Sequence, residues 1–373
     1  MGFRLPERKH PRIVGVDIGH QFIKVVELEL HKHSVAVTAA GAVPTPQQGV
    51  VEGQVVALDQ VSGALRNLLQ NCGVRASQAV AGVSGLSVYV RQMKLPRMNE
   101  TNLRRTLPFE ARKHINFNPE DTILECAVVP GAQDKSAPPE MDVLLVAAPK
   151  LLVESRVTAL EAAGLDPVAM DVASLATLRA LVPLDGDGTR NLAVADIGGA
   201  FTEVIIARKG VHAFQRTIQV GGATITQALC SALNLTPQQA VLAKESLTFD
   251  QIVEAKPGSR EPASVARQVL DDLVREVRRT LDFYISQFPE GTSEGVIDKM
   301  VLAGGTAKLS GLADYFARGL ELPTEVGVPY RASVASAGAD VQAALERDAP
   351  SLVQATGLAL WEAEASGLGL AGG

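Results

Sequence analysis

One short pattern occurs twice in this chain, and that repeat constrains its fold more than any other feature. Residues 13–26 read IVGVDIGHQFIKVV, and residues 192–206 read LAVADIGGAFTEVII. Counted from the aspartate, both copies read D-I-G-x-x-F, then two residues, then V-[VI]. Each copy predicts a buried strand, a sharp glycine turn and a second strand. Two copies at this distance favour two similar α/β domains that face each other, whereas a solenoid needs more copies at a shorter period.

The chain divides around these two copies. The sequence VPLDGDGTR at residues 182–190 is the strongest linker signal, because glycine, proline and aspartate favour turns over helices and strands. We therefore predict a first domain over residues 12–188 and a second over 189–362, with flexible termini at 1–11 and 363–373.

Each predicted domain contains a smaller unit. Residues 96–148 predict a small α+β subdomain inserted in the first domain. Its helix is expected to be kinked or broken at Pro108, and strands are expected at 122–129 and 141–148, joined by the loop PGAQDKSAPPE. In the second domain, residues 223–298 predict a subdomain of helices and sheet.

Composition excludes several classes of protein. The chain is 46% hydrophobic and 20% charged, as in soluble globular proteins. A net charge of -6 and an aromatic content of 4% disfavour nucleic-acid binding. The three cysteines, Cys72, Cys126 and Cys230, are widely spaced, which is typical of reduced thiols in the cytosol. No segment approaches the roughly 18 apolar residues that span a bilayer, so we expect a cytoplasmic protein without a transmembrane segment.

The two D-I-G turns have the chemistry of a phosphate site. A glycine turn lets backbone N–H groups approach an anion, and an aspartate at the end of a strand can hold a water molecule of hydrated Mg²⁺. Two facing turns can hold the phosphates of one nucleotide from both sides, with Lys24 adding a charge and Thr202 a hydroxyl. Either turn alone is also common in simple hairpins, so the prediction depends on the pair.

A third glycine turn strengthens this interpretation. AGGTAKLSG, residues 303–311, follows an apolar strand and precedes a helix, so a base or sugar can lie against its backbone. The P-loop motif G-x-x-x-x-G-K-[ST] does not occur. The histidines show no spacing typical of a metal site.

The three turns resemble the nucleotide site of the actin, Hsp70 and sugar-kinase superfamily. Within it, EARKHINFNPEDTILECAVV (110–129), QVGGATITQALCSALNLTPQQAVLAKES (219–246) and ATGLAL (355–360) are similar to the PilM family of type IV pilus assembly proteins. The FtsA cell-division proteins are the nearest related family. The resemblance covers about residues 12–362 and implies an actin-like (ribonuclease H-like) two-domain α/β fold with ATP and Mg²⁺ as cofactors.

The resemblance also assigns residues. The phosphate and Mg²⁺ positions fall on Asp17, Gly19, His20, Gln21, Lys24, Asp196, Gly198, Gly199 and Thr202, with Mg²⁺ held through water at Asp17 and Asp196. The rest of the nucleotide falls on Gly221, Gly222, Thr226, Lys244, Glu245, Gly304, Gly305, Thr306 and Gly311.

Several positions depart from the superfamily pattern. His20 replaces the small hydroxyl residue that usually follows D-I-G, and Gly199 with Ala200 leaves the second turn without a carboxylate or hydroxyl. Val241 stands where relatives often have a glutamate near the ribose. The best candidate for a base that activates water is Asp171, for which a structural turn is an equal alternative. We therefore expect ATP binding with weak or absent hydrolysis.

The resemblance implies a scaffold in the pilus machine. Such a protein is peripheral at the inner membrane through its partners. It binds the cytoplasmic N-terminal tail of the membrane protein PilN in a groove between the first domain and its insertion, and links it to the assembly ATPase and platform protein. Self-association is also compatible with this resemblance. Two alternatives stay open, namely an ATP-hydrolysing phosphotransferase or ATPase of the same superfamily, and an FtsA-like cell-division filament protein.

Overall fold

The computed structural model describes residues 12–31, 35–113, 115, 118–129, 139–182, 190–256, 258–289, 291–329, 334–336 and 338–362. The predicted flexible termini, 1–11 and 363–373, lie outside the described residues. So do most of the predicted linker, at 183–189, and most of the loop of the inserted subdomain, at 130–138.

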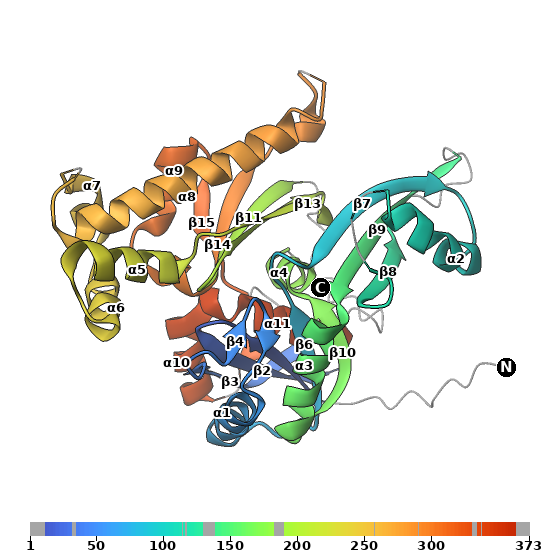
Figure 1. The fold of residues 1–373 in the computed structure, drawn as a ribbon, viewed down its shortest axis with the longest axis horizontal. Coiled ribbons are helices and arrows are strands. Elements are labelled where there is room, and N and C mark those ends of the chain that lie inside the picture. Colours follow the sequence, from blue (N-terminus) through green and yellow to red (C-terminus); the bar gives the residue numbers. More distant parts are fainter. Residues whose placement is uncertain are drawn as a thin grey trace.

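The first large sheet is built around the first copy of the repeat (Figure 1). Its strand order is β10-β6-β1-β2-β3-β16. Strands β1, β2 and β3 form an antiparallel meander. The next two strands of this sheet along the chain, β6 and β10, run parallel to β1. The bounds are β1 (Arg12–Ile18), β2 (Phe22–Leu30), β3 (Val35–Pro44), β6 (Gln78–Val83), β10 (Asp166–Val172) and β16 (Val334–Ser336).

The second large sheet repeats this topology around the second copy. Its order is β13-β12-β11-β14-β15, again an antiparallel meander followed by two strands parallel to its first strand. The bounds are β11 (Asn191–Ile197), β12 (Thr202–Arg208), β13 (Val211–Ile218), β14 (Lys299–Ala303) and β15 (Thr324–Val326). The repeat in the sequence is therefore a repeat of topology, and the predicted α/β class is confirmed.

Helices cover both faces of the first sheet. On one face, Val14, Val16 and Ile18 of β1 share a buried cluster with α1 (Leu58–Asn71) and α3 (Lys150–Ala162). On the other, Ile13 packs with α4 (Ala173–Leu181), α10 (Ala339–Asp348) and α11 (Val353–Ala359). Burial on both faces explains why β1 is apolar almost throughout. The sequence reading did not identify α4.

Helices α4 and α11 lie between the two large sheets. Besides contacting the first sheet, Leu178 of α4 and Val353 of α11 share a cluster with Val194, Ile205 and Val301 of the second. The opposite face of the second sheet packs on α5 (Gly222–Leu233), α8 (Pro262–Ile285) and α9 (Leu312–Leu320), with α6 (Pro237–Glu245) and α7 (Phe249–Glu254) beyond them. The short elements are β4 (Val50–Val51), β5 (Gln54–Val55), and the 3-10 helices η1 (Ser293–Gly295), η2 (Gly305–Lys308) and η3 (Ala349–Ser351).

The end of the chain returns to the first half. β16 pairs with β3, and α11 packs on β1 and α4, whereas the sequence predicts residues 189–362 as one second domain. The contact is very close, since a Cβ on Gly357 would lie 1.7 Å from the carbonyl oxygen of Ala176. Such long-range packing leaves no local signal in the sequence, and we propose that residues 334–362 belong with the first domain.

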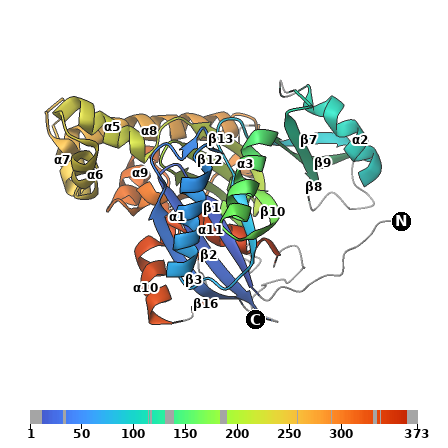
Figure 2. The same cartoon turned by 60° about the horizontal axis from the view of Figure 1, so that its bottom comes forward.

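The insertion forms a separate sheet of three strands with order β7-β9-β8. Its bounds are β7 (Tyr89–Pro96), β9 (Glu140–Pro149) and β8 (Thr122–Val128), and α2 (Glu100–Ala111) packs on one face. The unit thus begins with β7, before the predicted start at residue 96, and α2 continues through Pro108. In both views the inserted sheet lies at one end of the molecule, and helices α6 and α7 lie together at the other end (Figures 1 and 2).

Within the described ranges, no helix is long and apolar enough to cross a bilayer.

Candidate functional site

The two D-I-G turns have the same backbone geometry. In the first, the N–H of Gly19 donates to the carbonyl of Phe22 over 3.0 Å, and in the second the N–H of Gly198 donates to the carbonyl of Phe201 over 3.0 Å. A Cβ on Gly19 would lie 2.8 Å from the Phe22 carbonyl oxygen, so the turn requires glycine there. The turns are therefore equivalent in structure as well as in sequence.

Each turn leaves two consecutive N–H groups without a backbone partner. Among the described residues, the N–H groups of His20 and Gln21 in the first turn donate to no backbone acceptor, and neither do those of Gly199 and Ala200 in the second. Successive N–H groups of this kind form a concave site for anions. The side chain of His20 is exposed beside the first pair.

The two turns contact each other across the halves of the protein. A Cβ on Gly199 would lie 2.7 Å from Cγ of Gln21, so the first turn packs directly against the second. The absence of a side chain at Gly199 is what permits this approach. The structure thus brings together the residues on which the predicted phosphate site depends.

Lys24 lies among the carboxylates of both turns. Its Nζ is 2.8 Å from Oδ2 of Asp17, its partner across β1 and β2. Burial lowers the pKa of the Lys24 ammonium, but attraction to Asp17 and Asp196 outweighs that effect, so the pKa is raised. Oδ1 of Asp17 accepts a hydrogen bond from Nε2 of Gln354 in α11 over 3.3 Å.

Asp196 occupies the corresponding place in the second turn. Burial and the nearby Asp17 raise its pKa to about 6, although Lys24 and the hydroxyl of Thr177 favour the charged form. The Thr177 hydroxyl, on α4, donates to Oδ2 of Asp196 over 3.3 Å. The two helices between the sheets therefore each contact one of the two aspartates.

Glu203 is a site residue that the sequence reading missed. It is 5% exposed and lies opposite Asp196 in the pairing of β11 with β12, as Lys24 lies opposite Asp17. Burial and the charges of Asp196 and Asp17 raise its pKa to about 8, although the backbone of Gly85 donates a hydrogen bond to its carboxylate. Both copies of the repeat place an ionisable residue seven positions after the aspartate, and this spacing is the signal that identifies Glu203.

This raised pKa predicts a pH-dependent stability. In the folded protein the pKa of Glu203 is about 8, against an ordinary value of 4.5, so the folded state binds this proton more tightly. Its contribution to stability is present below pH 4.5 and is lost as the pH rises through about 8. Between about pH 6 and 7 we expect the wild type to lose on the order of 1 kcal/mol of stability per pH unit from this group, with a smaller loss as the pH approaches 8. Denaturant titrations of Glu203→Gln should show a flatter profile, and parallel profiles would contradict the assignment.

The hydroxyl of Thr202, predicted to contact phosphate, is hydrogen-bonded to the backbone within the second half. Its side chain is fully buried, and its hydroxyl donates to the carbonyl of Val220 over 2.7 Å. Successive residues of a strand face opposite sides, so Glu203 points toward Asp196 and Thr202 does not. Through this hydrogen bond, Thr202 connects β12 to the segment before α5.

The start of α5 is joined to the second turn. The N–H groups of Gly222 and Ala223 donate to the carbonyls of Gly198 and Gly199 over 2.9 and 2.8 Å. A Cβ on Gly221 would lie 2.6 Å from the carbonyl oxygen of Gly199, which explains the glycine at that position. These contacts fix the orientation of the second turn.

Lys244 lies above the first turn of α5. Its Nζ is 3.2 Å from the carbonyl oxygen of Gly222 and 3.1 Å from the hydroxyl of Thr226. Burial lowers the pKa of Lys244, although Glu245 favours its charged form. Glu245 itself is exposed. The structure thus brings Gly222, Thr226 and Lys244 together.

The third glycine turn is divided between two roles. Gly304 has a φ of 85°, and a Cβ there would lie 2.5 Å from Oδ1 of Asp196. Next to it, Gly305 faces open space, and the hydroxyl of Thr306 is 2.7 Å from the Cβ position of Gly222. Gly311 instead packs against Phe249 of α7. Gly304 and Thr306 therefore lie against Asp196 and Gly222, whereas Gly311 supports the start of α9.

Asp171 is engaged in other contacts. Its Oδ2 is 2.8 Å from Nη1 of Arg179, which also bonds the carbonyl of Gly357, and its Oδ1 accepts from the N–H of Val172. A carboxylate held in this way joins β10 to α4 and α11. This geometry favours the structural alternative over a base that activates water.

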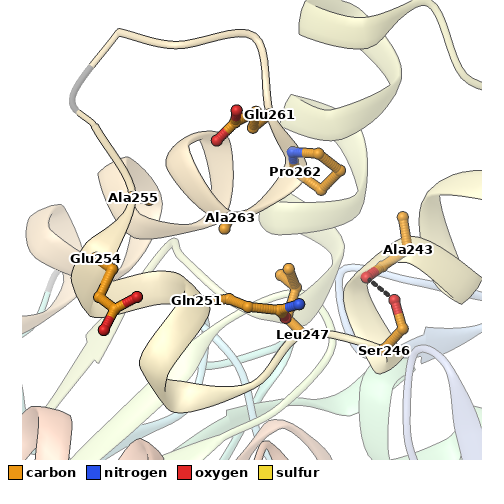
Figure 3. Close-up of a pocket in the computed structure, with 9 residues that line it drawn as sticks. All are labelled: Ala243, Ser246, Leu247, Gln251, Glu254, Ala255, Glu261, Pro262 and Ala263. Carbon is orange, nitrogen blue, oxygen red and sulfur yellow. Dashed lines mark hydrogen bonds between the residues drawn. The ribbon is translucent and has the colours of Figure 1, made fainter.

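A cavity of about 390 Å³ lies between α6, α7 and the start of α8 (Figure 3). Its wall includes Glu254 and Glu261, both exposed carboxylates that would repel phosphate. Ser246 bonds the carbonyl of Ala243, and Gln251 accepts from the N–H of Thr248. None of the predicted nucleotide residues lines this cavity, so its chemistry does not suit the phosphates.

The charges between the turns suit hydrated Mg²⁺. Asp17, Asp196 and Glu203 supply carboxyl oxygens that can accept hydrogen bonds from the water molecules around Mg²⁺. Within the part of the chain that the structure describes, no three His, Cys, Asp or Glu side chains are arranged to hold a metal ion directly. The free N–H pairs suit the phosphates that accompany the ion.

Comparisons with known proteins extend over nearly the whole chain. The family described as type IV pilus assembly protein PilM matches residues 15–363. Among solved structures, a PilM-PilN type IV pilus biogenesis complex has a TM-score of 0.81 at 26% identity, covering 94% of this chain and 98% of that chain.

More distant proteins share the fold. Cell division protein FtsA of Bacillus subtilis (strain 168) is 23% identical over 336 residues, which cover 80% of this chain and 74% of FtsA. MreB5 of Spiroplasma citri bound to AMPPNP has a TM-score of 0.56 at 11% identity, covering 96% of this chain and 98% of that chain. These similarities confirm the predicted actin-like α/β fold. Because the family match spans residues 15–363, the chain belongs to the family of the type IV pilus assembly protein PilM.

Proposed function

We propose that this chain is an ATP-binding scaffold of the type IV pilus assembly machine, cytoplasmic and peripheral at the inner membrane through its partners. One observation carries the nucleotide part of the proposal. Two equivalent turns, one from each half of the repeat, contact each other and leave N–H pairs beside Lys24. The binding of AMPPNP by a protein of the same fold supports it.

Different residues of the proposed site would contact different parts of the nucleotide. The N–H pairs of the two turns and Lys24 would hold the phosphates, and Asp17, Asp196 and Glu203 would hold Mg²⁺ through its waters. Mg²⁺ supplies positive charge that compensates the phosphate oxygens when it is bound. Gly222, Thr226, Lys244, Gly304, Gly305 and Thr306 would lie beside the adenosine. Calorimetric titration with ATP and Mg²⁺ tests the proposal, and the absence of saturable binding would refute it.

His20 is expected to limit hydrolysis more than binding. An exposed imidazole stands beside the free N–H pair of the first turn, where a small hydroxyl is usual in the superfamily. A hydroxyl can contact the terminal phosphate, and one such contact is worth on the order of 10²-fold in rate. We therefore expect His20→Ser to raise ATP turnover while changing ATP affinity less. Steady-state phosphate release and calorimetry measure the two effects, and equal changes would contradict this role.

A second candidate function is an ATPase or phosphotransferase, and Glu203 is the observation that favours it. A buried carboxyl group with a pKa of about 8 is close to the value that suits a general base near neutral pH. Turnover distinguishes the candidates. Several ATP molecules hydrolysed per second would favour the enzyme, and much slower hydrolysis with saturable binding would favour the scaffold.

We further propose that the partner is the cytoplasmic tail of PilN, bound between the first domain and the inserted sheet. The similarity to the PilM-PilN complex, with a TM-score of 0.81, supports this partner. β10 and β8 are outer strands of their sheets, so each offers unpaired backbone groups on one side. Val168 of β10 is 38% exposed, which provides apolar surface beside that edge.

Fluorescence polarisation with the tail peptide tests this site. Val168→Glu should weaken binding by about tenfold or more, because a charge replaces apolar contact area at the edge strand. Leu242→Glu is a matched control, since Leu242 is 67% exposed on α6, at the opposite end of the molecule. Equal effects of both variants would contradict the location, and the absence of saturable wild-type binding would refute the partner. We also propose that the chain binds the assembly ATPase and the platform protein, and that it associates with itself. Pull-down experiments with each of these partners test this.

A further inference from the structure

Arg156 is a buried cation directly behind the first turn. It lies on α3 and is 2% exposed. Its Nη1 donates to the carbonyl of Ile18 over 3.1 Å, and its Nη2 donates to the carbonyl of Gly53 over 2.8 Å. Ile18 is the central residue of the first D-I-G sequence, so this guanidinium contacts the turn that carries the proposed phosphate site.

No carboxylate forms a salt bridge with Arg156 among the described residues, and its buried Nε has no hydrogen-bond partner. A buried charge without a paired counter-charge is costly, so its retention calls for a compensating negative charge. Burial lowers its pKa to about 10, which leaves it charged at neutral pH, and Asp17 is the group that favours the charge. Nucleotide phosphates at the first turn would supply the remaining negative charge.

The hydrogen bonds of Arg156 fix the first peptide plane of the turn. The Ile18 carbonyl is held by Arg156, and the N–H of the same peptide, on Gly19, is held by Phe22. With both sides of this plane held, the next two N–H groups keep one orientation. In the second turn, the corresponding carbonyl of Ile197 lies against Gly304, and among the described residues a cation bonds this carbonyl in the first turn alone.

We propose that Arg156 is a positioning residue of the nucleotide site, which fixes the first turn and adds a buried positive charge behind the β- and γ-phosphates. This inference rests on the proposed ATP site. It assigns to one residue an effect on the terminal phosphates and none on the adenosine or the first phosphate.

The test compares the dissociation constants of ATP and AMP for the full-length protein with Mg²⁺, by competition against a fluorescent ATP analogue. Arg156→Met should weaken ATP about tenfold or more, as for loss of one charge-assisted interaction, and leave AMP within about twofold. Arg156→Lys keeps the charge and loses the paired hydrogen bonds, so its effect on ATP should be intermediate. Arg267→Met is the matched control, because Arg267 bonds the carbonyls of Val253 and Ala255 away from the turns.

Equal weakening of ATP and AMP by Arg156→Met would show a purely structural role and overturn the inference, as would unchanged affinity for both. If thermal unfolding shows that Arg156→Met does not fold, Arg156→Lys decides by the same comparison. A wild type that binds ATP no more tightly than AMP would refute the phosphate site itself, and the inference with it.

Discussion

Lys24→Met is expected to weaken ATP binding by roughly 30-fold or more. Nζ of Lys24 is 2.8 Å from Asp17, and Lys24 is attracted to Asp196 as well, so its removal leaves two carboxylates without their cation where phosphates must bind. Truncating one partner of a buried, hydrogen-bonded charge pair costs about 2–5 kcal/mol. Calorimetric titration with ATP and Mg²⁺ measures the change.

The control for this variant is Lys299→Met. Lys299 also lies on a strand, and its Nζ is also 2.8 Å from a carboxylate, that of Glu325. It begins β14, at the end remote from Gly304, so its loss should leave ATP affinity within about twofold, as for an independent site. An unchanged affinity of Lys24→Met, or an equal loss in both variants, would contradict the role of Lys24.

Gly357→Ala is expected to lower the free energy of unfolding by about 3 kcal/mol or more, because the new methyl group must displace backbone atoms. Its Cβ would lie 1.7 Å from the carbonyl oxygen of Ala176, where α11 crosses α4. This crossing also supports the site, since Gln354 of α11 contacts Asp17 and Thr177 of α4 contacts Asp196. Denaturant unfolding measures the loss, and ATP affinity should fall with it.

Gly63→Ala provides the comparison within the same protein. Gly63 lies inside α1, and a Cβ there meets no atom within 4 Å. Alanine is favoured over glycine inside a helix by about 0.5–1 kcal/mol, so this variant should be more stable than the wild type. If Gly357→Ala were also stabilising, the close crossing of α4 and α11 would be refuted.

The features that could be predicted from the sequence are those with a local cause. The D-I-G turns were predictable because their hydrogen bonds join residues three apart, as between Gly19 and Phe22. Their repetition also predicted two equivalent α/β units. By contrast, β16 pairs with β3 almost 300 residues earlier, and no local pattern predicts which distant segments will meet.

The site was predicted in part for the same reason. The sequence pointed to Thr202, whereas the structure places its neighbour Glu203 opposite Asp196, and in a strand a shift of one residue changes the face. Glu203 follows Asp196 by seven residues, as Lys24 follows Asp17, and this shared spacing was available in the sequence. Arg156 could not have been found, because only the fold brings α3 behind the first turn.

A crystal structure of the protein with ATP and Mg²⁺ tests the central claim most directly. The account predicts phosphate oxygens within about 3.2 Å of the N–H groups of His20 and Gln21 on one side and of Gly199 and Ala200 on the other, beside Lys24. Nucleotide density that contacts neither turn, or that lies in the cavity between α6, α7 and α8, would contradict it.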